Sequence, residues 1–435
     1  MKKTIMFAVL SILLTIPAFS SGLQEAIDSN FDSKVRSARS ALGLTMEIAE
    51  MDGKTVLTIP EQLAYFLPLE ESPDGFALPS MGITFTGKLP GKLTFSQNGY
   101  TEELEFRTVS YDSRSYYERT QEKDRPGFSE EEIYVTAADG AVLSGTLTLP
   151  ETATDACVIF ITGSGLQDRD SNIANHRTFM VLSDQIVASG FATLRFDDRG
   201  TGKSTGSAAG MTTLDLANDT EGIIAKAKEL GYERIILLGH SEGGVIAPVI
   251  ASRRADISAL ILLAPPAVSG REILLDQNRT ALSAAGAPEA MIEQVLTILS
   301  AVYDFVIAGD SKTAVSYMTQ IAGPAAADTV RALSDPWYRA FIELDPAAYL
   351  SLVKCPVLAI IGTKDTQVRP ALNREPLENA LNESGQEYEY LEPEGINHLM
   401  QSASTGLSSE YGLIEETVNP VILDAVTQFL KEMNP

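Results

Sequence analysis

The sequence predicts an α/β fold in which a mostly parallel sheet has helices on both faces, carries a helical cap and follows a small β-rich domain. From about residue 131 onward, short continuous apolar runs alternate with amphipathic helical stretches, which is typical of strands buried on both faces. Before residue 110, apolar and polar residues alternate one by one between tight turns, which is typical of antiparallel strands.

The composition fits a large folded chain and excludes several classes of function. The 435 residues are 44% hydrophobic and 21% charged, so they can form sizeable cores. Lys and Arg number 33 against 58 Asp and Glu, a formal net charge of -25, so neither nucleic acid nor anionic lipid is an expected partner. With 3 His and 2 Cys, no zinc finger or disulfide framework is expected, and Cys157 and Cys355 are predicted to be buried strand thiols.

The N-terminus has the layout of a secretory signal peptide. Lys2 and Lys3 precede an apolar run from Ile5 to Phe19, and small residues follow it. The run is shorter than the roughly 20 residues needed to span a bilayer, so we expect cleavage after Ser20 rather than an anchor helix. No second stretch is expected to span a membrane. The mature protein is predicted to be exported, and to be periplasmic or extracellular.

Residues 21–110 are predicted to form the β-rich domain, because alternating runs such as 54–59, 82–86 and 92–96 are separated by turn residues. Residues 111–130 are polar and charged and contain a Pro-Gly pair, so they are predicted to be a linker.

The α/β domain is predicted to span residues 131–435 and to begin with two strands joined by a turn, at 132–136 and 142–149. The strands expected next are 157–162, 191–196, 234–238, 259–263, 357–361 and 387–391, and the helices are 178–189, 213–230, 245–253 and 421–431. An insertion with helical periodicity at about 268–350 interrupts this alternation, so it is predicted to be a cap over the C-terminal edge of the sheet.

The strongest local motif is Gly239-His-Ser-Glu-Gly243, which lies between an apolar strand and a helix. The strand-to-helix turn is sharp, so glycine is needed two residues before and two residues after the serine. The turn exposes the Ser241 hydroxyl, and the helix that follows directs its positive end at a developing oxyanion. Ser241 is therefore the predicted nucleophile.

A serine hydroxyl needs a base to remove its proton, and the chain offers three histidines. His398 lies in a loop between the last strand and the last helix, where the chain order Ser, acid, His places the base. His240 adjoins Ser241, so its side chain is expected to point elsewhere and to pack. His176 is expected to pack in a loop, although a role in the substrate pocket stays open.

Asp365 follows the strand at 357–361 and is the predicted acid. It would accept the Nδ1 proton of His398 and leave Nε2 facing Ser241. The alternative is that Asp365 caps the N-terminus of a helix.

An oxyanion hole needs two preorganised donors. One is predicted to be the backbone N–H of Glu242, directly after the nucleophile. The other is predicted to be the backbone N–H of Ser164, in the loop after the strand at 157–162, where Gly163 and Gly165 let the backbone approach the substrate.

Two further motifs only partly match cofactor sites. Gly163-Ser-Gly165 begins like a dinucleotide-binding motif, but its sixth position is not glycine. Gly202-Lys-Ser204 ends like a phosphate-binding loop, but Asp197 stands where that motif needs glycine. No cofactor and no metal are therefore expected, and Asp198 and Arg199 are expected to hold loops by ion pairing.

Taken together, these motifs resemble the α/β-hydrolase family and, within it, exported EstD-like bacterial serine esterases. The segments that carry the resemblance are Gly163–Asp170, Phe196–Ser204, Gly239–Gly244, Gly362–Asp365 and Asn397–His398. The resemblance covers about residues 130–434, and the preceding linker and β-rich domain also look like those members. It implies an α/β-hydrolase fold, a triad of Ser241, Asp365 and His398, and short acyl esters as substrates.

The sequence thus predicts an exported carboxylesterase that acts on a small ester through an acyl-enzyme, without indicating an oligomeric state. A peptidase or amidase stays open, because Glu242 or a carboxylate of the cap could bind a substrate ammonium. A thioesterase or acyltransferase on the same triad, or a binding protein without catalysis, also stays open. Apolar residues of the cap, among them Trp337 and Phe341, are expected to line an acyl pocket.

Overall fold

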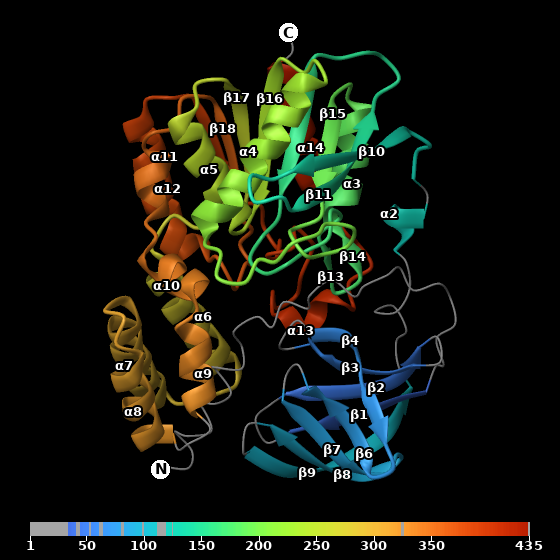
Figure 1. Ribbon diagram of the computed structural model, residues 1–435, viewed down its shortest axis with the longest axis vertical. Helices are drawn as coiled ribbons and strands as arrows, with labels where there is room; N and C mark the ends of the chain where they lie inside the picture. The colour runs from blue at the N-terminus through green and yellow to red at the C-terminus, as the bar shows by residue number, and fades with distance from the viewer. Residues whose placement is uncertain are drawn as a thin grey trace.

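The computed structural model describes residues 34–40, 44–51, 54–60, 64–79, 82–97, 100–110, 119–123, 125–322 and 326–433. The predicted signal peptide at 1–20 and residues 111–118 of the predicted linker lie outside the described residues. The described part of the chain contains a nine-stranded sheet, an eight-stranded sheet, a two-stranded hairpin and the helices around them (Figure 1).

An antiparallel sheet forms the N-terminal part, drawn in blue in Figure 1. Its described strands are β1 (Lys34–Arg39), β2 (Thr45–Met51), β3 (Lys54–Ile59), β4 (Ala64–Pro68), β5 (Glu70–Ser72), β6 (Gly75–Leu78), β7 (Ile83–Gly87), β8 (Gly91–Gln97) and β9 (Tyr100–Ser110), in the order β4-β3-β2-β1-β9-β8-β7-β6-β5. Strand β9 joins the two halves because it pairs with both β1 and β8. Alternate residues of both halves share one apolar core, in which the ring of Phe85 packs against those of Phe95 and Phe106.

The second sheet is mostly parallel, which confirms the predicted fold class. Its described strands are β10 (Ser129–Thr136), β11 (Val142–Leu149), β12 (Ala156–Ile161), β15 (Ala192–Phe196), β16 (Arg234–His240), β17 (Ile257–Leu263), β18 (Val357–Ile360) and β19 (Tyr388–Leu391), in the order β10-β11-β15-β12-β16-β17-β18-β19. Strand β11 pairs antiparallel with both β10 and β15, and the remaining neighbours pair parallel. Cys157 on β12 and Cys355 before β18 are buried and free, as predicted.

Helices cover both faces of this sheet. On one face α3 (Thr178–Ala188) packs with α14 (Pro420–Glu432). On the other, α4 (Thr213–Glu229) packs with α5 (Gly243–Arg253). Helix α11 (Pro346–Leu350) packs against both α5 and α12 (Pro370–Ser384). Short elements occur at the lower end of the sheet in Figure 1 and on the linker: β13 (Asn172–Ile173), β14 (His176–Arg177), α13 (Ser408–Tyr411) and α2 (Thr120–Lys123).

A group of helices between β17 and β18 occupies the place of the predicted cap. It contains α6 (Gly270–Ala284), α7 (Glu289–Ile307), α8 (Ser311–Ala322), α9 (Ala326–Leu333) and α10 (Pro336–Glu343). These helices share an apolar core of their own, to which α7 contributes Val295, Leu299 and Val302. Helix α7 is long and apolar enough to cross a membrane by length and composition, contrary to the expectation for this stretch, but its buried side packs in the cap core.

The central strands should contribute most to the stability of the α/β domain. Leu260 on β17 is completely buried, whereas the side chain of Leu352 after α11 is 58% exposed. We expect Leu260→Ala to lower the free energy of unfolding by about 2–5 kcal/mol, because it leaves a cavity in a packed core. Leu352→Ala should change it by less than about 0.5 kcal/mol. Urea unfolding followed by the fluorescence of Trp337, the single tryptophan, measures both. Equal shifts would contradict the assignment of the core.

Candidate active site

Strand β16 ends and α5 begins at a turn centred on Ser241, whose φ of 54° lies in the left-handed region that non-glycine residues seldom adopt. A Cβ atom at Gly239 would lie 2.1 Å from the carbonyl oxygen of Gly243, and one at Gly243 would lie 2.1 Å from that of Ile161. Neither position can therefore hold a side chain. The turn is also held to the neighbouring strand β17, because the Ser241 N–H donates to the carbonyl oxygen of Leu263.

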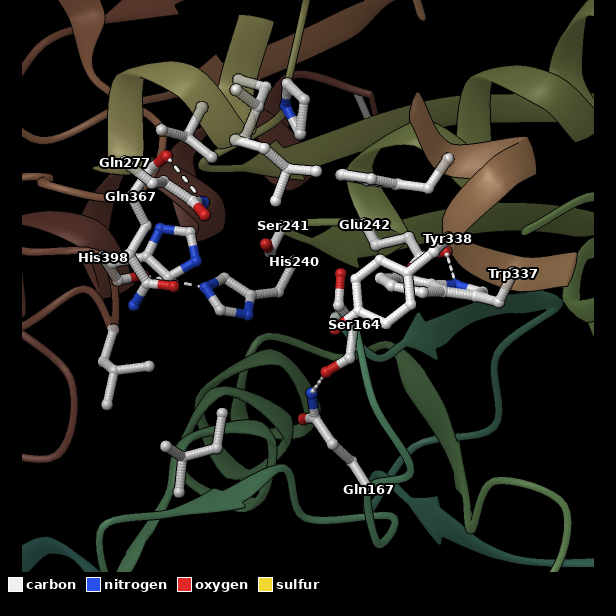
Figure 2. Close-up of a pocket in the computed structure, with 18 residues that line it drawn as sticks. Ser164, Gln167, His240, Ser241, Glu242, Gln277, Trp337, Tyr338, Gln367 and His398 are labelled. Carbon is white, nitrogen blue, oxygen red and sulfur yellow. Dashed lines mark hydrogen bonds between the residues drawn. The ribbon is translucent and has the colours of Figure 1, made fainter. Parts of the chain in front are cut away.

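Asp365 follows β18 and His398 follows β19, so both lie at the edge of the sheet where Ser241 is exposed. His398 Nδ1 is 2.8 Å from Asp365 Oδ2. Because a carboxylate only accepts, Nδ1 carries the proton and Nε2 is left to accept one. The Ser241 hydroxyl points toward the His398 ring, and both residues line one pocket (Figure 2).

Asp365 is held by the backbone that follows it. Its Oδ1 accepts hydrogen bonds from the N–H groups of Gln367 and Val368, each 2.8 Å long. Helix α12 begins only at Pro370, with Arg369 as its N-cap residue. Asp365 therefore is not the N-cap of that helix, which was the alternative considered for it.

Two backbone donors lie beside the nucleophile. Ser164 and Glu242 both line the pocket, and their N–H groups donate to no acceptor among the described residues. The loop that holds Ser164 passes directly next to Ser241, since a Cβ at Gly163 would lie 3.2 Å from the Ser241 Cβ. Gly165 turns this loop with a φ of 85°, a conformation that suits glycine.

Asp198 braces the same loop from inside the protein. Its carboxyl accepts from the hydroxyl of Thr162 at 2.8 Å and from the backbone N–H of Gln167 at 2.7 Å, so it spans the glycine-containing turn. Burial raises the pKa of Asp198 to about 8. The expected ion pairing is therefore wrong for Asp198 and right for Arg199, which pairs with Asp219. The sequence feature that could have indicated this role is the position of Asp198 directly after β15, at the catalytic edge of the sheet.

His240 lines the pocket, although its side chain was expected to point away from the site. Its ring centroid lies 4.8 Å from that of His398, and its Nε2 lies 2.8 Å from the backbone carbonyl oxygen of His398. Because a carbonyl only accepts, Nε2 donates this hydrogen bond. Burial and the neighbouring His398 lower the pKa of His240 to about 3, so its ring is neutral. His240 therefore packs, as expected, but against the predicted base.

His176 lies outside the pocket. It is completely buried, and its ring nitrogens lie 3.1 Å from the Thr417 hydroxyl and 2.9 Å from the carbonyl oxygen of Tyr411. Burial lowers its pKa to about 3. These contacts match the expected packing role, and His176 is not among the residues that line the pocket with Ser241. The described residues contain no group of three or more potential metal ligands.

Aromatic residues of α10 form one wall of the pocket. Trp337, Tyr338 and Phe341 line it, and the rings of Trp337 and Phe341 stack with centroids 5.1 Å apart. Figure 2 shows Trp337 and Tyr338 beside Glu242. Apolar residues of α7, such as Ile292 and Leu299, lie in the cap core, and Phe341 belongs to that core as well as lining the pocket. The cap thus has an apolar core of its own and supplies one wall of the pocket.

The side chain of Glu242 joins this wall to the nucleophile turn. Its Oε1 accepts from the indole N–H of Trp337 at 3.0 Å and from the hydroxyl of Thr213 at 2.6 Å. The carboxyl is buried, and burial raises its pKa, which favours the neutral form. Glu242 is the one acidic residue among the described residues that line the pocket.

Comparison with known proteins identifies the family through a family model that covers half of the chain. Residues 174–392 match the family described as serine aminopeptidase, S33. Esterase EstD from Thermotoga maritima is 25% identical over 285 residues, which are 65% of this chain and 62% of that protein, so the match spans less than two thirds of the relative. An esterase from Pyrococcus furiosus has a TM-score of 0.45 at 18% identity, covering 71% of this chain and 92% of that one. Est1E from Butyrivibrio proteoclasticus has a TM-score of 0.42 at 17% identity, covering 69% and 99%.

The raised pKa of Asp198 makes stability depend on pH. An exposed Asp of the unfolded chain titrates near about 4, whereas burial raises the pKa of Asp198 to about 8 in the folded protein. Folding therefore favours the protonated form, and this contribution is complete below about pH 4 and is lost as the pH rises toward 8. Asn cannot ionise, so the stability of Asp198→Asn relative to wild type should increase from pH 5 to pH 8.

Urea unfolding followed by Trp337 fluorescence at the two pH values measures this difference. Asp74→Asn, which removes an exposed carboxyl between β5 and β6, is the matched control. A difference between Asp198→Asn and wild type that stays constant with pH would show that Asp198 is ionised in the fold.

Proposed function

Since the chain belongs to the serine aminopeptidase S33 family of α/β-hydrolases, we propose that it is an exported serine esterase that hydrolyses short-chain acyl esters. The observation that carries the proposal is the meeting of four groups in one pocket: the Ser241 hydroxyl, the His398–Asp365 pair and two unpartnered backbone N–H groups. An apolar wall stands beside them, where an acyl chain would bind and exclude water.

In the first half of the proposed reaction, Ser241 Oγ attacks the ester carbonyl carbon. His398 Nε2 takes the hydroxyl proton, and Asp365 holds the Nδ1–H and stabilises the imidazolium that forms. The carbonyl oxygen becomes an oxyanion that accepts from the N–H groups of Ser164 and Glu242. When the tetrahedral intermediate collapses, the bond to the leaving oxygen breaks. His398 gives its proton to that oxygen, so an alcohol leaves and the acyl group stays on Ser241.

In the second half, water replaces the alcohol. His398 takes a proton from the water as its oxygen attacks the acyl carbon, and the same two N–H groups hold the oxyanion. Collapse breaks the bond to Ser241 Oγ, which recovers its proton from His398. A carboxylic acid is released and the enzyme returns to its starting state.

The pocket favours a neutral acyl group over an aminoacyl group. An aminopeptidase must hold a charged α-ammonium, which requires an accessible anion near the acyl carbon. The one acid that lines the described pocket, Glu242, already accepts from Trp337 and Thr213, and its burial favours the neutral form. This argues against the ammonium site that Glu242 could have provided, and so for an esterase rather than an aminopeptidase.

We also propose that the protein acts outside the cytoplasm, in the periplasm or beyond it. This rests on the signal-peptide layout of residues 1–20. Mass spectrometry of the mature N-terminus after expression with the full leader tests it.

The substrate class is tested by parallel assays. The mature protein should hydrolyse p-nitrophenyl acetate and butyrate with kcat/KM values well above those for aminoacyl p-nitroanilides. The opposite preference would support a peptidase on the same triad.

Loss of a triad member should abolish turnover of p-nitrophenyl butyrate while the protein stays folded. Because these residues act as a unit, Ser241→Ala and His398→Ala should each lower kcat by about 10⁶-fold. Asp365→Asn should lower it by about 10⁴-fold, since the wrong tautomer of His398 is then favoured. His176→Ala is the control histidine and should lower kcat by orders of magnitude less than His398→Ala. A loss as large as that of His398→Ala would mean that the base is misassigned.

Trimming the aromatic wall should change the acyl-chain preference. We expect Phe341→Ala and Trp337→Ala to shift the kcat/KM profile from acetate to decanoate esters by tens-fold, because each methylene in an apolar pocket contributes only about 1–3 kcal/mol. The change should appear mainly in KM. Phe305→Ala is the matched control, since Phe305 packs against the cap core and does not line the pocket. If all three variants keep the wild-type chain-length profile, the aromatic wall does not select the acyl chain.

A further inference from the structure

We propose that the N-terminal β-domain, residues 34–110, and the linker helix α2 are positioning elements of the active site, because they hold the loop that carries His398. This loop, residues 396–402, is called the base loop below. The proposal rests on the esterase function proposed above and gives the β-domain a role in catalysis. No β-domain residue lines the described pocket, so the role is indirect.

The base loop is compact, and Leu399 is its one apolar side chain outside the main core, which buries Ile396 and Met400. Ile396 and Ser402 pair as an isolated bridge at its ends. Inside it, Asn397 Oδ1 accepts from the N–H groups of Leu399 and Gln401, each 3.0 Å away. Leu399, directly after His398, is 2% exposed and also lines the pocket. The packing around Leu399 therefore bears on the orientation of His398.

The β-domain supplies half of that packing. Leu399 belongs to an apolar cluster, called the junction cluster, that consists of Val35, Ala49, Val56, Ala174, Leu399 and Tyr411. Its first three members lie on β1, β2 and β3. Successive residues of a strand face opposite sides, so Val56 faces the junction cluster while Leu57 lies in the core of the β-domain. Of the other members, Ala174 lies in the turn of the β13–β14 hairpin and Tyr411 on α13. Figure 1 shows this hairpin and α13 between the two large sheets.

The junction cluster also reaches the acid of the triad. The hydroxyl of Tyr411, a completely buried member, accepts from Gln367 Nε2 at 3.1 Å. The backbone N–H of Gln367 in turn donates to Asp365 Oδ1. One apolar cluster thus contacts the residue after the base and, through one glutamine, the acid.

Polar contacts of the linker fix the same region from the other side. Arg119 donates to the carbonyl oxygen of Gly412 at 2.6 Å. Gln121 Oε1 accepts from the N–H groups of Thr417 and Val418, and its Nε2 donates to the carbonyl oxygen of Val418. These bonds join α2 to the segment 411–418, almost 300 residues later in the chain.

Segment 411–418 and the residue after it hold the base loop directly. Gln401 Nε2 donates to the carbonyl oxygen of Glu416 at 3.1 Å, and the Ser402 N–H donates to Glu416 Oε1 at 2.7 Å. The Asn419 N–H donates to the carbonyl oxygen of Met400 at 2.8 Å. The N-terminal region therefore supports the base loop by two routes, one apolar and one polar.

Weakening the apolar route should displace His398 while leaving substrate binding in the pocket nearly unchanged. We expect the double variant Val35→Ala/Val56→Ala to lower kcat for p-nitrophenyl butyrate by roughly tenfold with KM within about twofold, because small displacements of a catalytic group reduce rate more than binding. Hydrogen–deuterium exchange in residues 396–402 should become faster. This second measurement does not depend on activity.

The matched control is Leu57→Ala/Ile59→Val, which removes about as many carbon atoms from the same strand region but only from the β-domain core. It should leave kcat and the exchange of residues 396–402 near wild type. Equal effects of the two double variants would overturn the proposal, as would unchanged kcat and exchange in Val35→Ala/Val56→Ala.

Gln121→Ala tests the polar route and replaces the apolar variant if that one does not fold. As with the apolar variant, kcat should fall and hydrogen–deuterium exchange in the base loop should become faster. If neither changes, the proposal is overturned. If the wild-type protein does not hydrolyse esters, the proposed function fails, whereas the exchange measurement still decides whether the β-domain holds the base loop.

Discussion

The backbone crowding at the turn between β16 and α5 is the constraint on which the rest of the site depends. Gly239 and Gly243 each pass so close to a carbonyl oxygen that no side chain fits, and this closeness holds Ser241 in a left-handed conformation. The hydroxyl is then exposed at the carboxyl edge of a parallel sheet. Asp365 and His398 reach it because their strands end at the same edge.

Buried polar groups then fix the loop and the part of the cap that surround the Ser241 hydroxyl. Asp198 spans the loop that brings the Ser164 N–H to the pocket, and Glu242 joins the cap to the nucleophile turn through Trp337. Burial raises the pKa of both carboxyls, and each holds its neighbours through hydrogen bonds. The cap contributes the apolar wall, while the β-domain packs against the base loop from outside the pocket.

The sequence predicts the parts of this arrangement that depend on local pattern. Apolar strands, amphipathic helices and the glycines around Ser241 leave periodic or spacing signals, and the order of the chain points to the acid and the base. Contacts between distant segments leave no such signal. The bond from His240 to the His398 carbonyl joins residues 158 positions apart, and the linker contacts join residues almost 300 apart. The expectation that His240 points away failed for this reason.

The most direct test of the account is to locate the covalent bond that the nucleophile forms. The mature protein treated with a fluorophosphonate should gain one adduct, and peptide mass spectrometry should place it on Ser241. Ser241→Ala, correctly folded, should gain none. An adduct on another residue, or a folded wild-type protein that does not react, would contradict the assignment of Ser241 as an activated nucleophile.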